Sequence, residues 1–162
     1  MPIYMSYGAV TGDVSEAGHV GWIELNSIQW GVGRGVSSPV GATADRESSS
    51  PSVSEVTITK DQDVSSNGLL TETFNGDGGG NGETVKIDMV RTQSGQQVVY
   101  QTIVLYNVII SGYSTSSGGD RPSESLSLNF VKISVTNTPM NKDGTTGSPA
   151  TTTYDLSLAK TV

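Results

Sequence analysis

The sequence offers few side chains able to carry catalysis. It has no cysteine and a single histidine, His19, which follows Glu16 and precedes Glu24. Thiolate ligands and a two-histidine metal site within one chain are therefore excluded. A histidine near a carboxylate can serve as a general base, but no serine stands in a nucleophile-elbow motif. A structural hydrogen bond is the favoured interpretation of His19, and no cofactor is expected.

Several other motifs resemble ligand sites only in part. The glycine-rich stretch 76–82 has no Gly-Lys-Ser/Thr and is expected to follow a helix, whereas a phosphate loop precedes one. Asp61, Asp63 and Asp143 lack the full spacing of a calcium loop. The 16 acidic residues allow many glycosidase-like carboxylate pairs, and nothing selects one of them. A hydrolase with such a pair therefore stays open without named residues.

One short segment concentrates charge in a chain that is only 15% charged. Asp120, Arg121 and Glu124 lie between two strong strand patterns. Arg121 can bridge Asp120 or Glu124 across a turn, because a guanidinium binds carboxylates in a fixed geometry. The segment is interpreted as a structural corner rather than as a catalytic site.

Composition limits the class of protein and its partners. A mass of 16.9 kDa fits one domain over residues 1–162, and the abundance of β-branched residues and glycine predicts a mainly β fold. The net charge of −7 argues against nucleic acid and anionic membranes as partners. No apolar run is long enough to insert into a membrane, and residues 1–4 do not begin a signal peptide. Synthesis in the cytoplasm is expected.

Hydrophobic alternation predicts the strands, and one segment predicts a helix. Parity changes near Asn26 and within 125–135 predict bulges or a corner. A helix is expected over 65–75, begun by Ser65 or Ser66, buried through Leu70 and Phe74, and closed by Gly76. The expected strands cover residues 3–8, 22–32, 53–60, 84–92, 98–113, 125–135 and 153–160.

Two segments suggest contacts outside the fold. The strand 98–113 is apolar on both faces, so the face turned away from the core must be covered by the helix, a second sheet or another subunit. Ile103, Leu105 and Ile109, on its odd-numbered face, are the candidates for contact with another subunit. The polar loop of about residues 36–52 is too long to serve only as a connection. Its candidate contact residues are Ser37, Ser38, Arg46 and Glu47.

Four segments together resemble one known family. Residues 118–130, with the run Gly-Gly-Asp-Arg-Pro-Ser-Glu, carry the most specific motif. Residues 1–5, 18–31 and 51–60 agree with the same pattern. The chain resembles, over nearly its whole length, the haemolysin-coregulated protein (Hcp) family of type VI secretion systems.

The resemblance implies a two-sheet β-barrel with one flanking helix and no enzymatic activity. It implies homohexameric rings that stack into a tube under a spike protein of the VgrG type, inside a contractile sheath. The tube leaves the cell without a signal peptide and carries small effectors in its lumen. Period two places Gln29 opposite Ile28 and Trp30, and the resemblance assigns that face to the lumen. It also assigns the loop 36–52 to the face between rings.

A different class stays open beside this interpretation. A monomeric β-barrel that binds carbohydrate or peptide fits the same composition. The mass of the native protein distinguishes the two, because only a tube protein must form closed rings.

Overall fold

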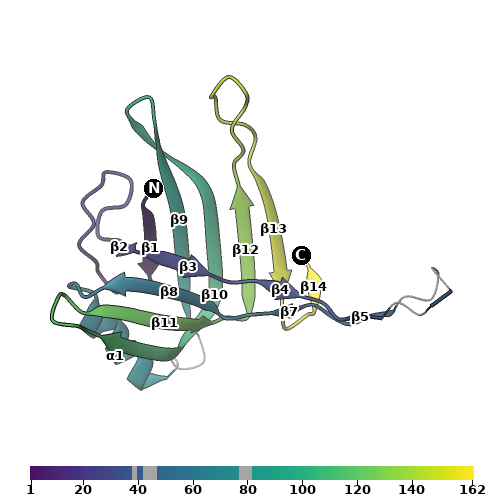
Figure 1. The fold of residues 1–162 in the computed structure, drawn as a ribbon, viewed down its shortest axis with the longest axis horizontal. Helices are drawn as coiled ribbons and strands as arrows, with labels where there is room; N and C mark the ends of the chain where they lie inside the picture. Colours follow the sequence, from purple (N-terminus) through teal and green to yellow (C-terminus); the bar gives the residue numbers. More distant parts are fainter. Residues whose placement is uncertain (38–39, 42–46, 77–81) are drawn as a thin grey trace.

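The protein is mainly β with one helix, as the computed structural model shows for residues 1–37, 40–41, 47–76 and 82–162 (Figure 1). The strands are β1 (Ile3–Tyr7), β2 (Ile23–Leu25), β3 (Ser27–Gln29), β4 (Val32–Gly33), β5 (Val36–Ser37), β6 (Glu47–Ser48), β7 (Ser52–Val53), β8 (Val56–Asp61), β9 (Glu83–Gln93), β10 (Gln96–Ser116), β11 (Ser123–Asn129), β12 (Lys132–Asn137), β13 (Ala150–Asp155) and β14 (Lys160–Thr161), and the helix is α1 (Ser66–Asn75).

The two sheets share strand β10. Its central part pairs with β9 on one side and β12 on the other, and its last part pairs with β11. From β11 the pairing continues to β8 and β3, and from β9 it continues to β1 and β2. The first sheet thus contains β1, β2, β9, β10 and β12, and the second contains β3, β8, β11 and the end of β10. Because β2 runs directly into β3, the chain joins the sheets a second time, and the two sheets enclose a common core.

The predicted irregularity near Asn26 is confirmed. β2 pairs with β1, whereas β3 pairs with β8, and the break between them falls at Asn26. The backbone N–H of Asn26 donates to the carbonyl of Thr59 at 2.7 Å. The parity change in 125–135 is the predicted corner, which separates β11 from β12.

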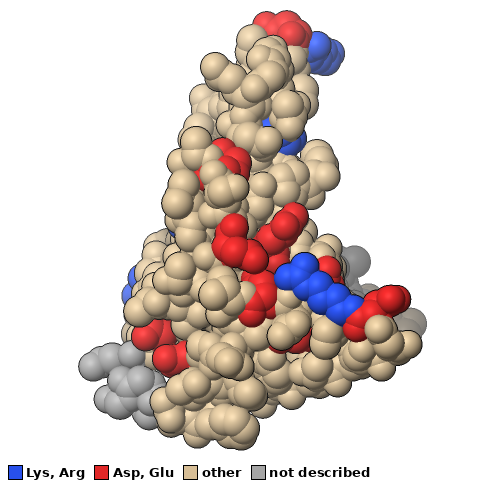
Figure 2. Space-filling model, turned by 90° about the vertical axis from the view of Figure 1, so that its left-hand side faces the viewer, with Lys and Arg blue, Asp and Glu red and all other residues tan. Residues whose placement is uncertain are grey.

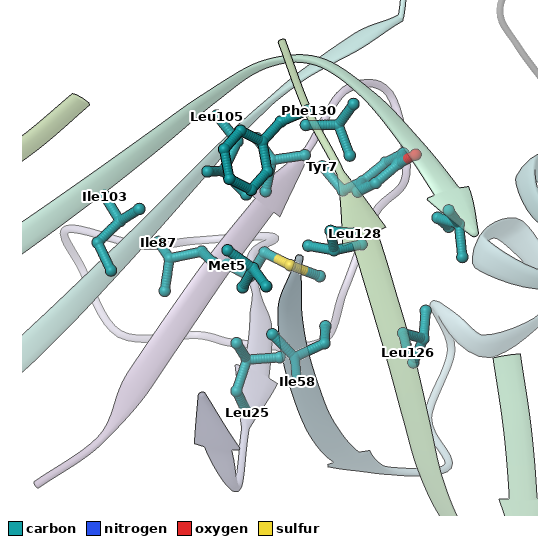
Figure 3. Packing of buried hydrophobic residues seen from close by; sticks show 14 of the residues in the cluster. Met5, Tyr7, Leu25, Ile58, Ile87, Ile103, Leu105, Leu126, Leu128 and Phe130 are labelled. Carbon is teal, nitrogen blue, oxygen red and sulfur yellow. The ribbon is translucent and has the colours of Figure 1, made fainter. Parts of the chain in front are cut away.

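The core lies between the two sheets and is built from alternate residues of their strands. Figure 3 shows Met5 and Ile87 of one sheet facing Ile58 and Leu126 of the other. All four side chains are fully buried. Burial of such side chains contributes about 1.5–3 kcal/mol each.

The expectation that Ile103 and Leu105 contact another subunit is wrong. Both side chains are fully buried in the core (Figure 3). The register of β10 against β9 shifts between Leu105 and Val108, and Asn107 has a φ of 54°. This bulge reverses the parity of the strand, so Ile103 and Leu105 point inward before it, whereas Val108 and Ile110 do so after it. A second register shift between Ile110 and Gly112 restores the first parity. Ile109, after the bulge, is 36% exposed.

Helix α1 occupies the predicted span but packs through only part of the expected face. Leu69, expected beside Leu70 and Phe74, is buried and Leu70 is half-buried, whereas Phe74 is 81% exposed, so the expected packing of Phe74 is wrong. A Cβ on Gly68 would lie 3.0 Å from Val10, so the missing side chain brings this face close to its neighbour. Gly76 follows the helix with the expected positive φ of 82°. No helix in the described ranges is long and apolar enough to cross a membrane.

The segment predicted as a long loop begins and ends as a two-stranded arm. β4 pairs with β7, and β5 pairs with β6, both antiparallel. Gly35 and Ser49 exchange hydrogen bonds between these pairs. Figure 1 shows the arm extending away from the two sheets. The arm is stabilised by hydrogen bonds between its paired strands rather than by burial of apolar side chains. Hydrophobic patterning therefore could not predict its strands.

Candidate functional site

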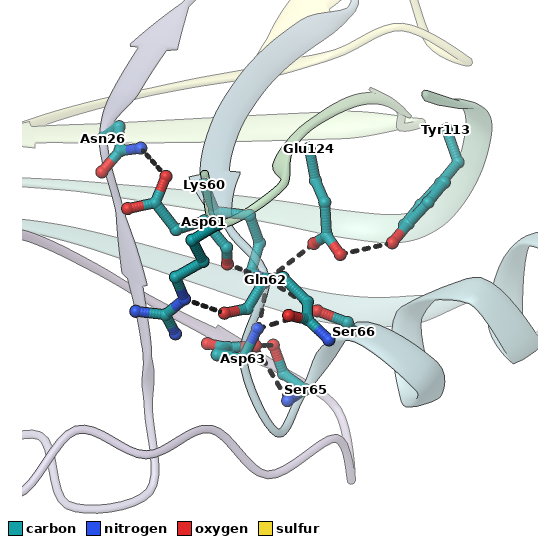
Figure 4. A network of polar contacts seen from close by, with 10 residues as sticks. Asn26, Lys60, Asp61, Gln62, Asp63, Ser65, Ser66, Tyr113 and Glu124 are labelled. Atoms are coloured by element: carbon teal, nitrogen blue, oxygen red, sulfur yellow. Dashed lines mark hydrogen bonds and ion pairs between the residues drawn. The ribbon is translucent and has the colours of Figure 1, made fainter. Parts of the chain in front are cut away.

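A buried lysine organises the end of the molecule near α1 (Figure 4). The Nζ of Lys60 lies 2.8 Å from Oε2 of Glu124 and 3.0 Å from Oδ1 of Asp63. It also donates to the carbonyl of Asp61 at 2.9 Å. Tyr113 donates its hydroxyl proton to the other oxygen of Glu124 at 2.6 Å. A buried ammonium is tolerated here because carboxylates and a carbonyl satisfy its donors.

The same network begins the helix. Oδ1 of Asp63 accepts from the backbone N–H of Ser65 at 2.9 Å, and Oγ of Ser66 accepts from the N–H of Asp63 at 3.0 Å. Ser65 itself makes no side-chain cap hydrogen bond. The expected side-chain cap from Ser65 is therefore wrong, and Asp63 instead fixes the turn that leads into the helix.

The structural corner uses partners that the sequence did not predict. Arg121 donates its Nε–H to the carbonyl of Gln62 at 2.6 Å, while Glu124 pairs with Lys60. The carbonyl of Asp120 accepts from the Ser117 hydroxyl at 2.8 Å. The expected bridge from Arg121 to Glu124 is therefore wrong: Glu124 points inward between the sheets, while Arg121 stays exposed.

The network controls the ionisation of its acid. Burial alone would raise the pKa of Glu124, but hydrogen bonds donated by Lys60, Tyr113 and Ser66 outweigh it and lower the pKa below 4.5. Burial and the Glu124 carboxylate raise the pKa of Tyr113 to about 12. Glu124 therefore stays ionised and Tyr113 stays protonated at neutral pH, which suits an ion-pair network with a structural role.

Acidic side chains gather on the side of the molecule shown in Figure 2. Asp13, Glu24, Asp61 and Asp63 line a small hollow of about 110 Å³ together with Asn26 and Arg121. Asn26 donates to Asp61 at 3.0 Å. Within the described ranges, no three His, Asp or Glu side chains group in a way that could hold a metal ion.

His19 is buried and bonded on both ring nitrogens. Its Nδ1 lies 2.5 Å from Oε2 of Glu16, and its Nε2 lies 2.9 Å from Oδ2 of Asp88. Sequence reasoning considered Glu16 but missed Asp88, which stands 69 residues away in the chain. The pairing of β1 with β9 brings Asp88 next to the segment that contains His19.

Gln29 lies on a face of the second sheet that is rich in hydroxyl groups and carries Asp61 at one end. The core side of β8 carries Val56 and Ile58, so the opposite side carries Thr57 and Thr59. Gln29 is exposed and pairs with Thr57. The cross-strand rows of this hydroxyl face contain Ser27, Thr59, Ser125 and Ser114, and Gln29, Thr57, Ser127 and Gly112.

An apolar groove lies between the base of the arm and the strands β12 to β14. Its volume is about 400 Å³. Trp30 and Tyr154 also pack against the core, so the groove continues the apolar interior to the surface. Sequence reasoning missed it, because its walls come from six separate stretches of the chain. Its lining residues are Trp30, Val32, Pro51, Val53, Gln101, Ile133, Val135, Asn137, Thr152, Tyr154 and Thr161.

The candidate contact residues of the arm divide into two groups. Ser37 is exposed in β5, and Glu47 belongs to β6. Ser38 and Arg46 lie outside the described residues.

Comparison with known proteins places this architecture in a family. Residues 4–136 match the family described as "Type VI secretion system effector, Hcp". No match is found among curated protein sequences.

Solved structures share the fold. A type six secretion system protein is 23% identical, with a TM-score of 0.87 and 99% of each chain covered. Hcp1 from Salmonella typhimurium is 17% identical, with a TM-score of 0.76 over 99% of this chain and 98% of that one. A type VI secretion system effector from Yersinia pestis is 20% identical, with a TM-score of 0.71 over 94% and 98%.

The family match extends over most of the chain, and the shared fold agrees with it. The protein belongs to the Hcp family of the type VI secretion system, whose members are structural proteins rather than enzymes.

Proposed function

We propose that this chain is the subunit of a type VI secretion inner tube, assembled as hexameric rings that stack and are expelled from the cell. The tube stands under a spike protein, inside a contractile sheath, and carries small effectors in its lumen. Membership of the Hcp family carries the proposal. Three surfaces of the molecule support it, and each has its own test.

The apolar groove supports ring formation. A ring requires two different surfaces of one chain to meet head to tail. The groove supplies an apolar surface that one copy leaves open, and we assign its covering to the next copy in the ring. This contact takes the place of the one expected at Ile103 and Leu105.

Adjacent residues of β13 provide a matched test of the groove. Thr152 lines it, whereas Thr151 points to the other side of the strand, and both are exposed. Thr152→Arg is expected to yield monomers in native mass spectrometry, while Thr151→Arg keeps rings visible by negative-stain microscopy. A wild-type chain that stays monomeric at high concentration contradicts the ring itself and favours a monomeric carbohydrate- or peptide-binding module. Rings that persist in Thr152→Arg contradict only the groove.

The hydroxyl face supports a lumen at Gln29. Neutral hydroxyl and amide groups present hydrogen bonds to a passing protein without imposing a charge. Because the chain has no cysteine, Gln29→Cys is a clean probe of exposure. A maleimide too bulky to enter the ring should label it in monomers but not in rings. Thr71→Cys, on the exposed side of α1, is the control that should react in both. Equal labelling of both variants in rings places Gln29 outside the lumen.

The arm supports contact between rings, because it extends beyond the two sheets (Figure 1). Removal of residues 37–49 should leave rings intact while reducing stacking and secretion. The pairs of β4 with β7 remain in this variant, so the base of the arm keeps its structure. Normal tubes and normal export by the shortened protein contradict this role.

A further inference from the structure

His19 joins a surface segment to the first sheet. Residues 8–22 connect β1 to β2, and their backbone hydrogen bonds run among themselves, as between Gly12 and Gly21, apart from the bond that Val10 donates to the carbonyl of Tyr7 at the end of β1. His19, from this segment, bonds Asp88 of β9 at 2.9 Å. His19 and Asp88 are almost completely buried.

The hydrogen bonds around the ring require two protons on it. Oε1 of Glu16 accepts from the N–H of Gly18, and its other oxygen faces Nδ1 of His19. Oδ1 of Asp88 accepts from the Thr102 hydroxyl, and its other oxygen faces Nε2. Ionised carboxylates only accept hydrogen bonds, and a neutral imidazole has a single N–H. Both bonds therefore exist together only when the ring is an imidazolium.

The charges around the ring favour that state. The titratable groups that face it are Glu16 of its own segment, Tyr4 of β1, and Lys86 and Asp88 of β9, with Glu24 of β2 close to Tyr4 and Glu16. Lys86 lies 3.9 Å from Asp88. Carboxylates already outnumber cations here when the ring is protonated. Loss of the proton adds to the excess negative charge, which is costly where Asp88 is buried.

The surrounding groups keep their own states while the ring changes. The hydrogen bond from His19, with a second from Gly18, lowers the pKa of Glu16. Burial, followed by the charges of Glu24 and Glu16, raises the pKa of Tyr4. Glu16 therefore stays ionised and Tyr4 neutral across the neutral range.

We propose that His19 is a proton-dependent latch that holds residues 8–22 against the first sheet at lower pH and releases them when the ring loses its second proton. The His19 ring meets Trp22 edge-on, with centroids 4.7 Å apart, and Asp13 of the same segment lines the acidic hollow. Release therefore changes the acidic side of the molecule in Figure 2. This inference does not depend on ring formation.

The test follows the ring and the segment in the same full-length protein. Nitrogen-15 NMR of His19 reports its protons, and hydrogen exchange, corrected for intrinsic rates, reports protection of residues 8–22. Protection is expected to fall at least about tenfold as the ring deprotonates, the worth of one charge-assisted hydrogen bond. Protection of β11 should stay constant, and native mass measured at each pH separates release from any change in assembly.

Variants distinguish a latch from a ring that merely titrates. His19→Gln and Asp88→Asn should each show low protection of residues 8–22 with no pH transition. Glu24→Gln removes a nearby carboxylate that does not bond the ring, and it should keep the transition. Constant protection while the wild-type ring deprotonates overturns the latch, even if a variant fails to fold. A transition that persists in a folded His19→Gln protein overturns it as well.

Discussion

The ammonium of Lys60 and the carboxylate of Glu124 form an ion pair of 2.8 Å with both side chains almost fully shielded from water. β8 supplies the lysine and β11 the acid, and their register places the two residues directly opposite each other. The pair joins the second sheet to the start of α1 through Asp63.

Glu124→Gln is expected to lower the free energy of unfolding by about 3–5 kcal/mol, because it leaves a buried ammonium without its closest charge partner. Urea denaturation measures the change. Asp120→Asn, in the exposed turn of the same segment, is the control and should shift stability by no more than about 0.5 kcal/mol. Equal stability of the two variants would contradict a stabilising role for the pair.

Stability should also fall in acid through Glu124. Its pKa is lowered in the folded protein from 4.5, so the unfolded chain binds this proton more readily. The contribution is therefore complete above the unfolded pKa and is lost as pH falls through the folded one. Urea midpoints below about pH 5 should drop more steeply for wild type than for Glu124→Gln. Parallel curves would mean that other carboxylates dominate the acid response.

Ile103→Ala should destabilise the monomer by about 2–5 kcal/mol, since it leaves a cavity in the core. Ile109→Ala, on the same strand but after the bulge at Asn107, should change stability by at most about 1 kcal/mol. Thermal or urea unfolding compares them directly. A larger loss at Ile109 than at Ile103 would mean that the bulge does not set the inward face in solution.

Gly12→Ala should destabilise residues 8–22, because a Cβ at Gly12 would overlap the carbonyl of Trp22. Gly118→Ala is the matched control, since no atom lies within 4 Å of a Cβ at that position. Proteolysis within residues 8–22 should accelerate in the first variant alone. Unchanged cleavage in Gly12→Ala would show that the segment adjusts to the extra carbon.

Local pattern predicted most elements because it reports which residues avoid water. Alternation identified β1, β8 and β9, and the parity change at Asn26 identified the break between β2 and β3. The serine and glycine boundaries located α1 to within one residue. The motif around residues 118–130 pointed to the Hcp family, which the match over residues 4–136 established.

The sequence by itself determined the fold class, most of the elements and the family, because apolar spacing and turn residues act over a few neighbours. The strands of the arm were not predicted, and the expected strand 153–160 is divided between β13 and β14 by a turn. Only the tertiary structure decided which face of β10 points inward, since the bulge at Asn107 reverses the parity of the strand and a second register shift between Ile110 and Gly112 reverses it again. It also chose Asp88 for His19 and Lys60 for Glu124, which stand 69 and 64 residues apart in the chain. Strand register brings such pairs together, and register depends on the whole sheet rather than on any local pattern.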